Sequence, residues 1–323
     1  MKNKTIKTIK IINEKEIRLV YENNLPTLMT EWFELQMLWL NAAYKNFKDH
    51  DKFLILIYIV KKTFDHYASN LVNLNFQEFY NLEKVEIAKF NTIEISKKLN
   101  ISRETTRRKI HELEKSGIIE KNKKTLLVRN AAFQIQNPEN IISSVIQFLN
   151  RFSKICEKNN ILENELSNKE IENCLLAKFS YAWKMWYEML IPNLVIWKKF
   201  YVDLETYHIF GAVVVNQAYE TSKILKKKNM SVSNRNEYLQ MIRNIDSKTG
   251  INAMSISVLT GIPRATVIRK LKDLLKKKKI VINDKKLYFL KSEIVPQLGI
   301  IQSKIIDNLS NFTTKSFNLV RFN

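Results

Sequence analysis

The chain has 323 residues, enough for two domains of ordinary size that each bury a core. Its net charge of +21 predicts a polyanionic partner, because so large an excess of cations repels itself in the folded state. Cys156 and Cys174 lie outside any CxxC spacing, which argues against a disulfide framework and a zinc site. We expect no signal peptide and no membrane span, and therefore a cytoplasmic protein.

Five glycines and five prolines are far below average usage, so turns are few and the sequence predicts a mainly α fold. Residues 4–21 alternate apolar and charged side chains around Asn13 and predict a small N-terminal hairpin. Apolar residues then recur at helical spacing over 30–46 and 52–67, and again over 141–152.

The second half of the chain repeats this order. A helix rich in aromatic residues contains Pro192, which predicts a break or kink, and further helices are expected over 204–218 and 300–312. Between the halves, an Asn- and Glu-rich stretch predicts a solvated, partly helical connector. The expected parts are an N-terminal extension at 1–24, a first repeat at 25–155, the connector at 156–175 and a second repeat at 176–323.

One motif occurs twice, 161 residues apart. Residues 93–129 align without a gap to residues 254–290, and the shared residues include Arg103/Arg264, Thr105/Thr266, Arg108/Arg269 and Lys109/Lys270. Residues 103–129 carry nine Lys or Arg against four Glu, and residues 264–291 carry eleven against two Asp. Most of the excess charge therefore belongs to the motif.

The motif predicts a helix, a sharp turn and a second helix. A turn of this kind needs a residue that tolerates positive φ, and the two copies place Asn100 and Gly261 there. Ser102 is a good N-cap for the second helix, and Pro263 replaces it where a missing N–H costs little.

Helical spacing divides the second helix of each copy into two faces. We expect the inward faces to be Thr106, Ile110 and Leu113 in the first copy and Val267, Leu271 and Leu274 in the second. The candidate DNA-binding residues on or beside the outward faces are Ser102, Arg103, Glu104, Thr105, Arg107 and Arg108, and Arg264, Ala265, Thr266, Ile268 and Arg269.

These outward faces suit the major groove, where Arg can bond guanine and Glu can accept from cytosine. Ala265 and Ile268 can contact only thymine methyl groups, so we expect unequal half-sites, with the second richer in A·T. Two short apolar β segments follow each helix and form a hairpin, or wing. The wing-tip lysines Lys123, Lys124, Lys285 and Lys286 are expected to contact phosphates.

The segment ISRETTRRKIHELEKSGII followed by NKKTLLV, over residues 101–128, resembles the winged-helix DNA-binding domain of the cyclic-AMP receptor protein family. The resemblance implies that Arg103, Glu104 and Arg108 touch bases. In the second copy Arg264 and Arg269 match, and Ala265 replaces the Glu. The segment TGIPRATVIRKL is similar to the IclR-type winged helix.

No β-barrel precedes the motif, so no cyclic-nucleotide site is carried over. A helix pair before each motif and one helix after it is similar to the layout of MarR-type regulators, whose terminal helices make the dimer. The resemblance implies two winged helix-turn-helix domains, arisen by internal duplication and embedded in long helices that form an internal pseudo-dimer.

Other kinds of site are not favoured by the sequence. His50 and His66 lie near acidic residues, but their spacing is not that of a metal site, and solvated or capping roles are expected. No catalytic motif is present, so we expect neither an enzyme nor a cofactor. The aromatic residues Trp32, Trp39, Trp183, Trp186 and Trp197 are expected in the core or at a dimer seam, with an effector pocket as the alternative.

Three functions remain open on this basis. The first is a sequence-specific transcription regulator, associated with the nucleoid, that reads two half-sites on double-stranded DNA about one helical turn apart. The second is a plasmid or phage replication initiator, a class that also joins two winged-helix domains in one basic chain. The third is an adaptor that binds proteins. A homodimer is possible in each case.

Overall fold

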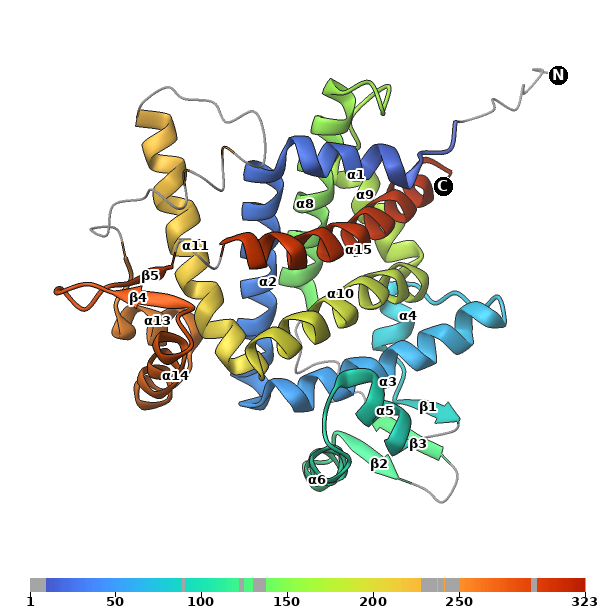
Figure 1. Ribbon diagram of the computed structural model, residues 1–323. Coiled ribbons are helices and arrows are strands. Elements are labelled where there is room, and N and C mark those ends of the chain that lie inside the picture. Colours follow the sequence, from blue (N-terminus) through green and yellow to red (C-terminus); the bar gives the residue numbers. More distant parts are fainter. Residues whose placement is uncertain are drawn as a thin grey trace.

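The computed structural model describes residues 10–88, 91–121, 125–129, 138–227, 237, 241, 250–291 and 295–322. Over these residues the fold is mainly helical, as the sequence predicts (Figure 1). The first half contains α1 (Glu14–Asn23), α2 (Leu25–Phe47), α3 (His50–Ser69), α4 (Phe76–Tyr80), β1 (Lys84–Ala88), α5 (Thr92–Leu99), α6 (Arg103–Lys115), β2 (Ile119–Lys121), β3 (Thr125–Arg129) and α8 (Pro138–Lys158). The second half contains α9 (Asn168–Ala177), α10 (Phe179–Tyr201), α11 (Leu204–Lys227), α13 (Ala253–Thr260), α14 (Arg264–Lys276), β4 (Ile280–Ile282), β5 (Tyr288–Leu290) and α15 (Val295–Arg321).

The predicted N-terminal hairpin is wrong for the residues that the structure describes, because 14–23 form α1. Asn13 and Glu16 make a capping box at the start of this helix. Ile17, Val20 and Tyr21 follow at helical spacing and are buried. The apolar residues thus share one helical face, and the alternation that suggested a strand is incidental.

Apart from α4, the helices described in the two halves correspond and follow the same order. Helices α1 and α9 are both 10 residues long, and α2 and α10 are both 23 residues long. The capping box of α1 also has a counterpart in α9, where Ser167 and Glu170 take the places of Asn13 and Glu16. The repetition therefore extends from the motif to nearly the whole chain.

The connector predicted at 156–175 is partly helical, as expected, and most of its residues are exposed. It contains the end of α8 and most of α9, the counterpart of α1, and Leu162, Leu166 and Ile171 in it are buried. Of the predicted break or kink at Pro192, the break is wrong, because α10 continues through this residue to Tyr201. The predicted helices over 141–152 and 300–312 are parts of the longer helices α8 and α15.

The halves pack against each other reciprocally. Helix α3 packs on α10 of the other half, and its counterpart α11 packs on α2. In the same way α1 packs on α15, and α9 packs on α8. Trp32 and Trp186, which occupy equivalent positions, meet in the core with ring centroids 6.2 Å apart. The long helices of both halves thus share one hydrophobic core.

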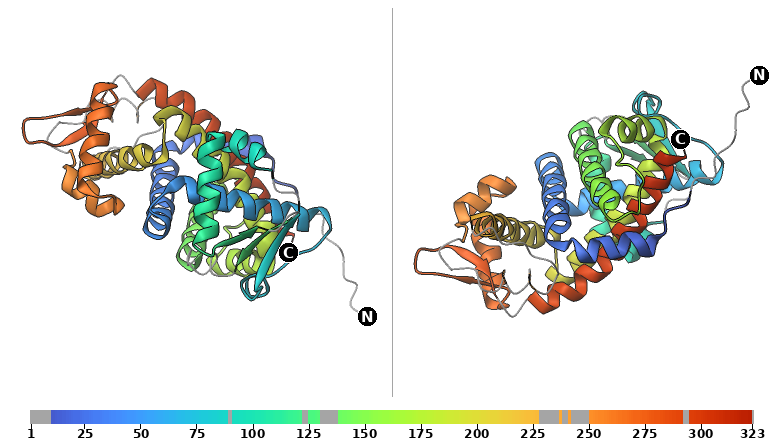
Figure 2. Two further views of the ribbon diagram at one scale, coloured as in Figure 1. Left: turned by 90° about the horizontal axis from the view of Figure 1, so that it is seen from below. Right: turned by 90° about the horizontal axis from the view of Figure 1, so that it is seen from above.

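Each half also carries a helix–turn–helix with a small antiparallel sheet. In the first half β3 lies between β1 and β2, and in the second half β4 pairs with β5. The two sheets lie toward opposite ends of the elongated molecule (Figure 2). No helix in the described part of the chain is long and apolar enough to cross a membrane.

Candidate nucleic-acid interface

The turn between α5 and α6 has the geometry that the sequence predicts. Asn100 ends α5 in the left-handed conformation, with φ of 52°. The hydroxyl of Ser102 then caps α6 by accepting from the backbone N–H of Thr105. Across the turn, Ser96 Oγ donates to the carbonyl of Ile101 at 2.6 Å. Local hydrogen bonds therefore hold the two helices at a fixed angle.

The second copy reproduces this turn with different residues. Gly261 ends α13 with φ of 67°, and Pro263 occupies the N-cap position of α14, as predicted. Ser257 Oγ donates to the carbonyl of Ile262 at 2.7 Å, like Ser96 in the first copy. The two turns are equivalent in conformation and in their cross-turn hydrogen bond.

The predicted division of α6 and α14 into two faces is confirmed. The inward residues Thr106, Ile110, Leu113, Val267, Leu271 and Leu274 are all buried. Of the candidate reading residues, Ser102, Arg103, Glu104, Arg107, Arg108, Arg264, Ala265 and Arg269 are exposed, whereas Thr105, Thr266 and Ile268 are half-buried. Each helix thus presents a largely exposed face that carries Arg residues.

The arginines of the first copy are little engaged within the chain. Arg108 lies 3.9 Å from Glu112 and keeps 65% of its side chain exposed. Arg103 and Arg107 form no ion pair with any residue that the structure describes. Their guanidinium groups are therefore available to an external anion or hydrogen-bond acceptor.

The second wing forms where the sequence predicts it. Lys285 and Lys286 are exposed in the turn between β4 and β5, which the side chain of Asn283 closes by accepting from the N–H of Leu287 at 2.9 Å. The other two wing residues, Lys123 and Lys124, lie outside the described residues, although β2 and β3 on either side of them pair as predicted.

Two lysines on these helices have a role that the sequence analysis missed. Lys109 of α6 forms an ion pair with Asp49, and Lys270 of α14 forms one with Asp203 at 2.5 Å. Both lysines are well shielded, with 13% and 10% of their side chains exposed. The signal was present in the sequence, because both copies share Lys109 and Lys270 although neither lysine is among the candidate DNA-binding residues.

The role expected for His50 is wrong. His50 is buried, not solvated, and its Nε2 lies 3.2 Å from Nδ1 of His208, which is also buried. His208 Nε2 in turn lies 2.7 Å from the side-chain oxygen of Asn41. Within the described residues no group of His, Cys, Asp and Glu is arranged to hold a metal ion.

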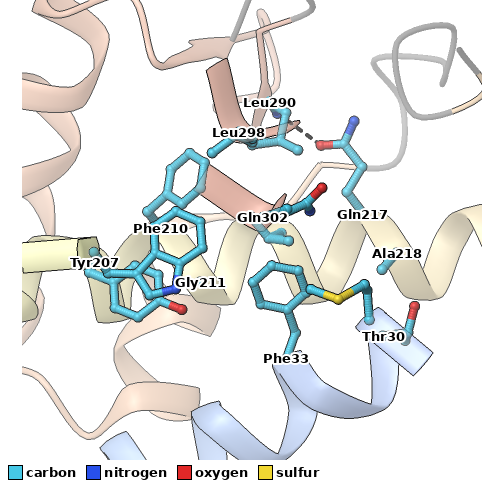
Figure 3. Close-up of a pocket in the computed structure, with 13 residues that line it drawn as sticks. Thr30, Phe33, Tyr207, Phe210, Gly211, Gln217, Ala218, Leu290, Leu298 and Gln302 are labelled. Atoms are coloured by element: carbon cyan, nitrogen blue, oxygen red, sulfur yellow. Dashed lines mark hydrogen bonds between the residues drawn. The ribbon is translucent and has the colours of Figure 1, made fainter. Parts of the chain in front are cut away.

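The tryptophans lie in the core, the first of the two alternatives for them. Trp197 also lines a mostly apolar cavity between α2, α11, β5 and α15 (Figure 3). At its rim, the side-chain oxygen of Gln217 accepts from the N–H of Leu290, which ties β5 to α11. Gln302 also lines the cavity, and its side-chain oxygen is buried without a hydrogen-bond partner among the described residues.

Comparisons of this chain with protein-family models, with curated proteins and with solved structures found no match.

Proposed function

We propose that this chain is a sequence-specific double-stranded DNA-binding protein with two winged helix-turn-helix domains, acting as a transcription regulator. Helices α6 and α14 are its two reading helices, and each enters the major groove at one half-site. The reciprocal packing of the long helices supports an internal pseudo-dimer. One chain carries both reading helices, so the proposal needs no second copy.

The observation that carries the proposal is the equivalence of α6 and α14. Both helices are 13 residues long, follow the same left-handed turn, bury the same face and expose the other. The exposed faces share two arginines, Arg103/Arg264 and Arg108/Arg269, which can bond guanine or phosphate. A repeated exposed face of this kind fits a ligand that is itself repetitive, as duplex DNA is.

The arrangement of the molecule is compatible with both helices meeting one DNA. In Figure 1, α6 and α14 both lie on the lower side of the molecule, and the view from below in Figure 2 includes both. The excess positive charge is concentrated in the same two segments. A duplex running along this side would meet both reading helices and the basic wings.

The two half-sites are expected to differ. Arg103, Glu104 and Arg107 offer hydrogen bonds to base edges, and a good bidentate pair discriminates by about 1–3 kcal/mol. Ala265 and the half-buried Ile268 offer only apolar contact. The first helix should therefore select G·C-containing sequence, and the second should prefer A·T.

Selection of bound sequences from a random duplex library tests the proposal. We expect a site of two unequal elements about one helical turn apart. Arg103→Ala should relax selection at one position of the G·C-containing element, because it removes a base contact. Lys285→Ala should instead weaken binding to all sequences and reduce the salt slope by about one, because it removes a phosphate contact.

Two results would count against the proposal. One is enrichment of no sequence, with binding that disappears at moderate salt. The other is an equal loss of affinity for selected and random DNA in Arg103→Ala, since the arginine would then contribute charge and no base contact.

A further inference from the structure

The shared lysines of the two reading helices are tied to the same place in each half. Lys109 pairs with Asp49, which precedes α3, and Lys270 pairs with Asp203, which precedes α11. Asp49 and Asp203 are equivalent residues, because each follows a 23-residue helix after one residue with positive φ, Lys48 or Val202. The same internal link therefore occurs twice.

Each aspartate is itself held in place by the helix that it precedes. Asp49 Oδ1 accepts from the N–H of Asp51 and of Lys52. Asp203 Oδ1 accepts from the N–H and the hydroxyl of Thr206, at 2.7 and 2.8 Å. Burial alone would raise the pKa of both aspartates, but the lysines and these hydrogen bonds outweigh burial and lower it. Both aspartates are therefore ionised at neutral pH.

The two helix starts meet between the halves. His50, next to Asp49, contacts His208 of α11, and Lys198 of α10 donates to Asp51 of α3 at 2.7 Å. One cavity is lined by both aspartates together with Lys48, His50, Asp51, Leu204 and Glu205. The Lys109–Asp49 and Lys270–Asp203 pairs thus meet at this one cavity, which both aspartates line.

We propose that Asp49 and Asp203 are positioning residues that fix the orientation of the two reading helices relative to each other, and so set the spacing between the half-sites. This inference rests on the proposed function. Each base pair turns the DNA by about one tenth of a helical turn, so a fixed pair of helices accepts only one spacing. A pair of helices whose relative orientation is loose accepts several spacings.

Asparagine is the substitution that isolates this role. Asn is as good an N-cap as Asp, so Asp49→Asn and Asp203→Asn keep the caps of α3 and α11 and remove the charge that faces lysine. In Asp203→Asn, Lys270 still has Glu205 at 3.8 Å. Glu188→Gln is the matched control, because it removes ion pairs with Lys184 of α10 and Lys315 of α15, which involve neither reading helix.

The first measurement is independent of DNA. Spin labels at His111→Cys and Lys272→Cys, equivalent exposed positions on α6 and α14, report the distance between the reading helices. The native cysteines Cys156 and Cys174 are buried and should not compete for label. We expect one narrow distance distribution in the parent and in Glu188→Gln, and a broader one in the double variant Asp49→Asn/Asp203→Asn.

The second measurement is affinity for two half-sites whose spacing is changed by one base pair at a time. The parent should lose about tenfold in affinity per step from its optimum, and the double variant less than about threefold, while affinity for a single half-site stays within about twofold. The double variant Lys109→Gln/Lys270→Gln breaks the same ion pairs by removing the lysines. It should show the same broader distance distribution and the same weaker spacing preference as Asp49→Asn/Asp203→Asn.

The outcomes separate the two proposals. An unchanged distance distribution in both double variants overturns the positioning role, whatever the DNA result. A broadened distribution in a protein that selects no DNA sequence keeps the link between the helices and overturns the proposed function. A loss of single half-site affinity as large as the loss for the paired site, without a change in spacing preference, also overturns the positioning role.

Discussion

At the scale of single residues, the buried pair His50–His208 is the feature that most departs from expectation. The sequence suggested a solvated or capping role for His50, yet its ring and that of His208 are buried at the junction between the halves. Burial lowers the pKa of His50 to about 4, although Asp49 and Asp203 act in the opposite direction. Burial and the neighbouring His50 also lower the pKa of His208. Both imidazoles are therefore neutral in the folded protein at neutral pH.

This pair makes stability depend on pH. The unfolded chain protonates His50 near pH 6.5 and the folded chain only near pH 4. The free energy of unfolding therefore keeps its full value above pH 6.5. It falls as the pH drops toward 4, by an amount on the order of 3 kcal/mol. We expect His50→Gln to flatten the fall in the free energy of unfolding between pH 6.5 and 4.5, measured by urea denaturation. His111→Gln, with an exposed histidine, is the control, and an equal slope in parent and His50→Gln would contradict the assignment.

At the scale of elements, the turns that precede α6 and α14 show two residue types meeting one backbone requirement. Asn100 and Gly261 both have positive φ, and a Cβ on Gly261 would meet no atom within 4 Å. A side chain at this position therefore destabilises the turn only through the left-handed backbone conformation, and not through a steric clash. The two sheets differ in β1, which extends the first sheet. Among the described residues its counterpart in the second half is an isolated bridge between Ile251 and Tyr288.

We expect Gly261→Ala to lower the free energy of unfolding by about 1–2 kcal/mol, because the left-handed conformation is unfavourable for Ala. Gly261→Asn should cost less than Gly261→Ala, because Asn tolerates this conformation and occupies it in the first copy. Chemical denaturation of the two variants provides the measurement. Equal costs for Ala and Asn would mean that the turn changes conformation in the variants.

At the scale of the whole molecule, the halves are joined by their cores. Trp32 and Trp186 lie at the centre, and each half contributes helices that cover the other. Hydrogen bonds between the ends of the chain add to this, since the side chain of Asn318 bonds both the N–H and the carbonyl of Ile12. A core shared in this way predicts that neither half unfolds by itself.

Trp186→Ala should therefore destabilise both halves together. We expect a loss of about 3–5 kcal/mol and a single unfolding transition, with faster amide exchange in both α3 and α11. Tyr181→Ala, which removes an exposed ring from the same helix, should change stability by less than about 0.5 kcal/mol. Two separate transitions, with exchange altered in α11 alone, would show that the halves are independent.

The sequence by itself determined the local structure of the motif. The ends of α5 and α6, the left-handed residues Asn100 and Gly261, the cap at Ser102 and the buried faces all depend on interactions between residues close in the chain, which leave a readable pattern. The exposure of Arg103, Arg107 and Arg108 followed from the same helical periodicity.

Only the tertiary structure decided what distant residues do. Residues 14–23, part of the hairpin expected over 4–21, form a helix whose apolar face packs on α15. Helix α9, most of which lies in the expected connector, packs on α8 in the equivalent way. The pairs Lys109–Asp49 and Lys270–Asp203 and the contact of His50 with His208 join residues 60 to 158 positions apart. Such contacts depend on how the helices pack, and no local pattern in the sequence records that.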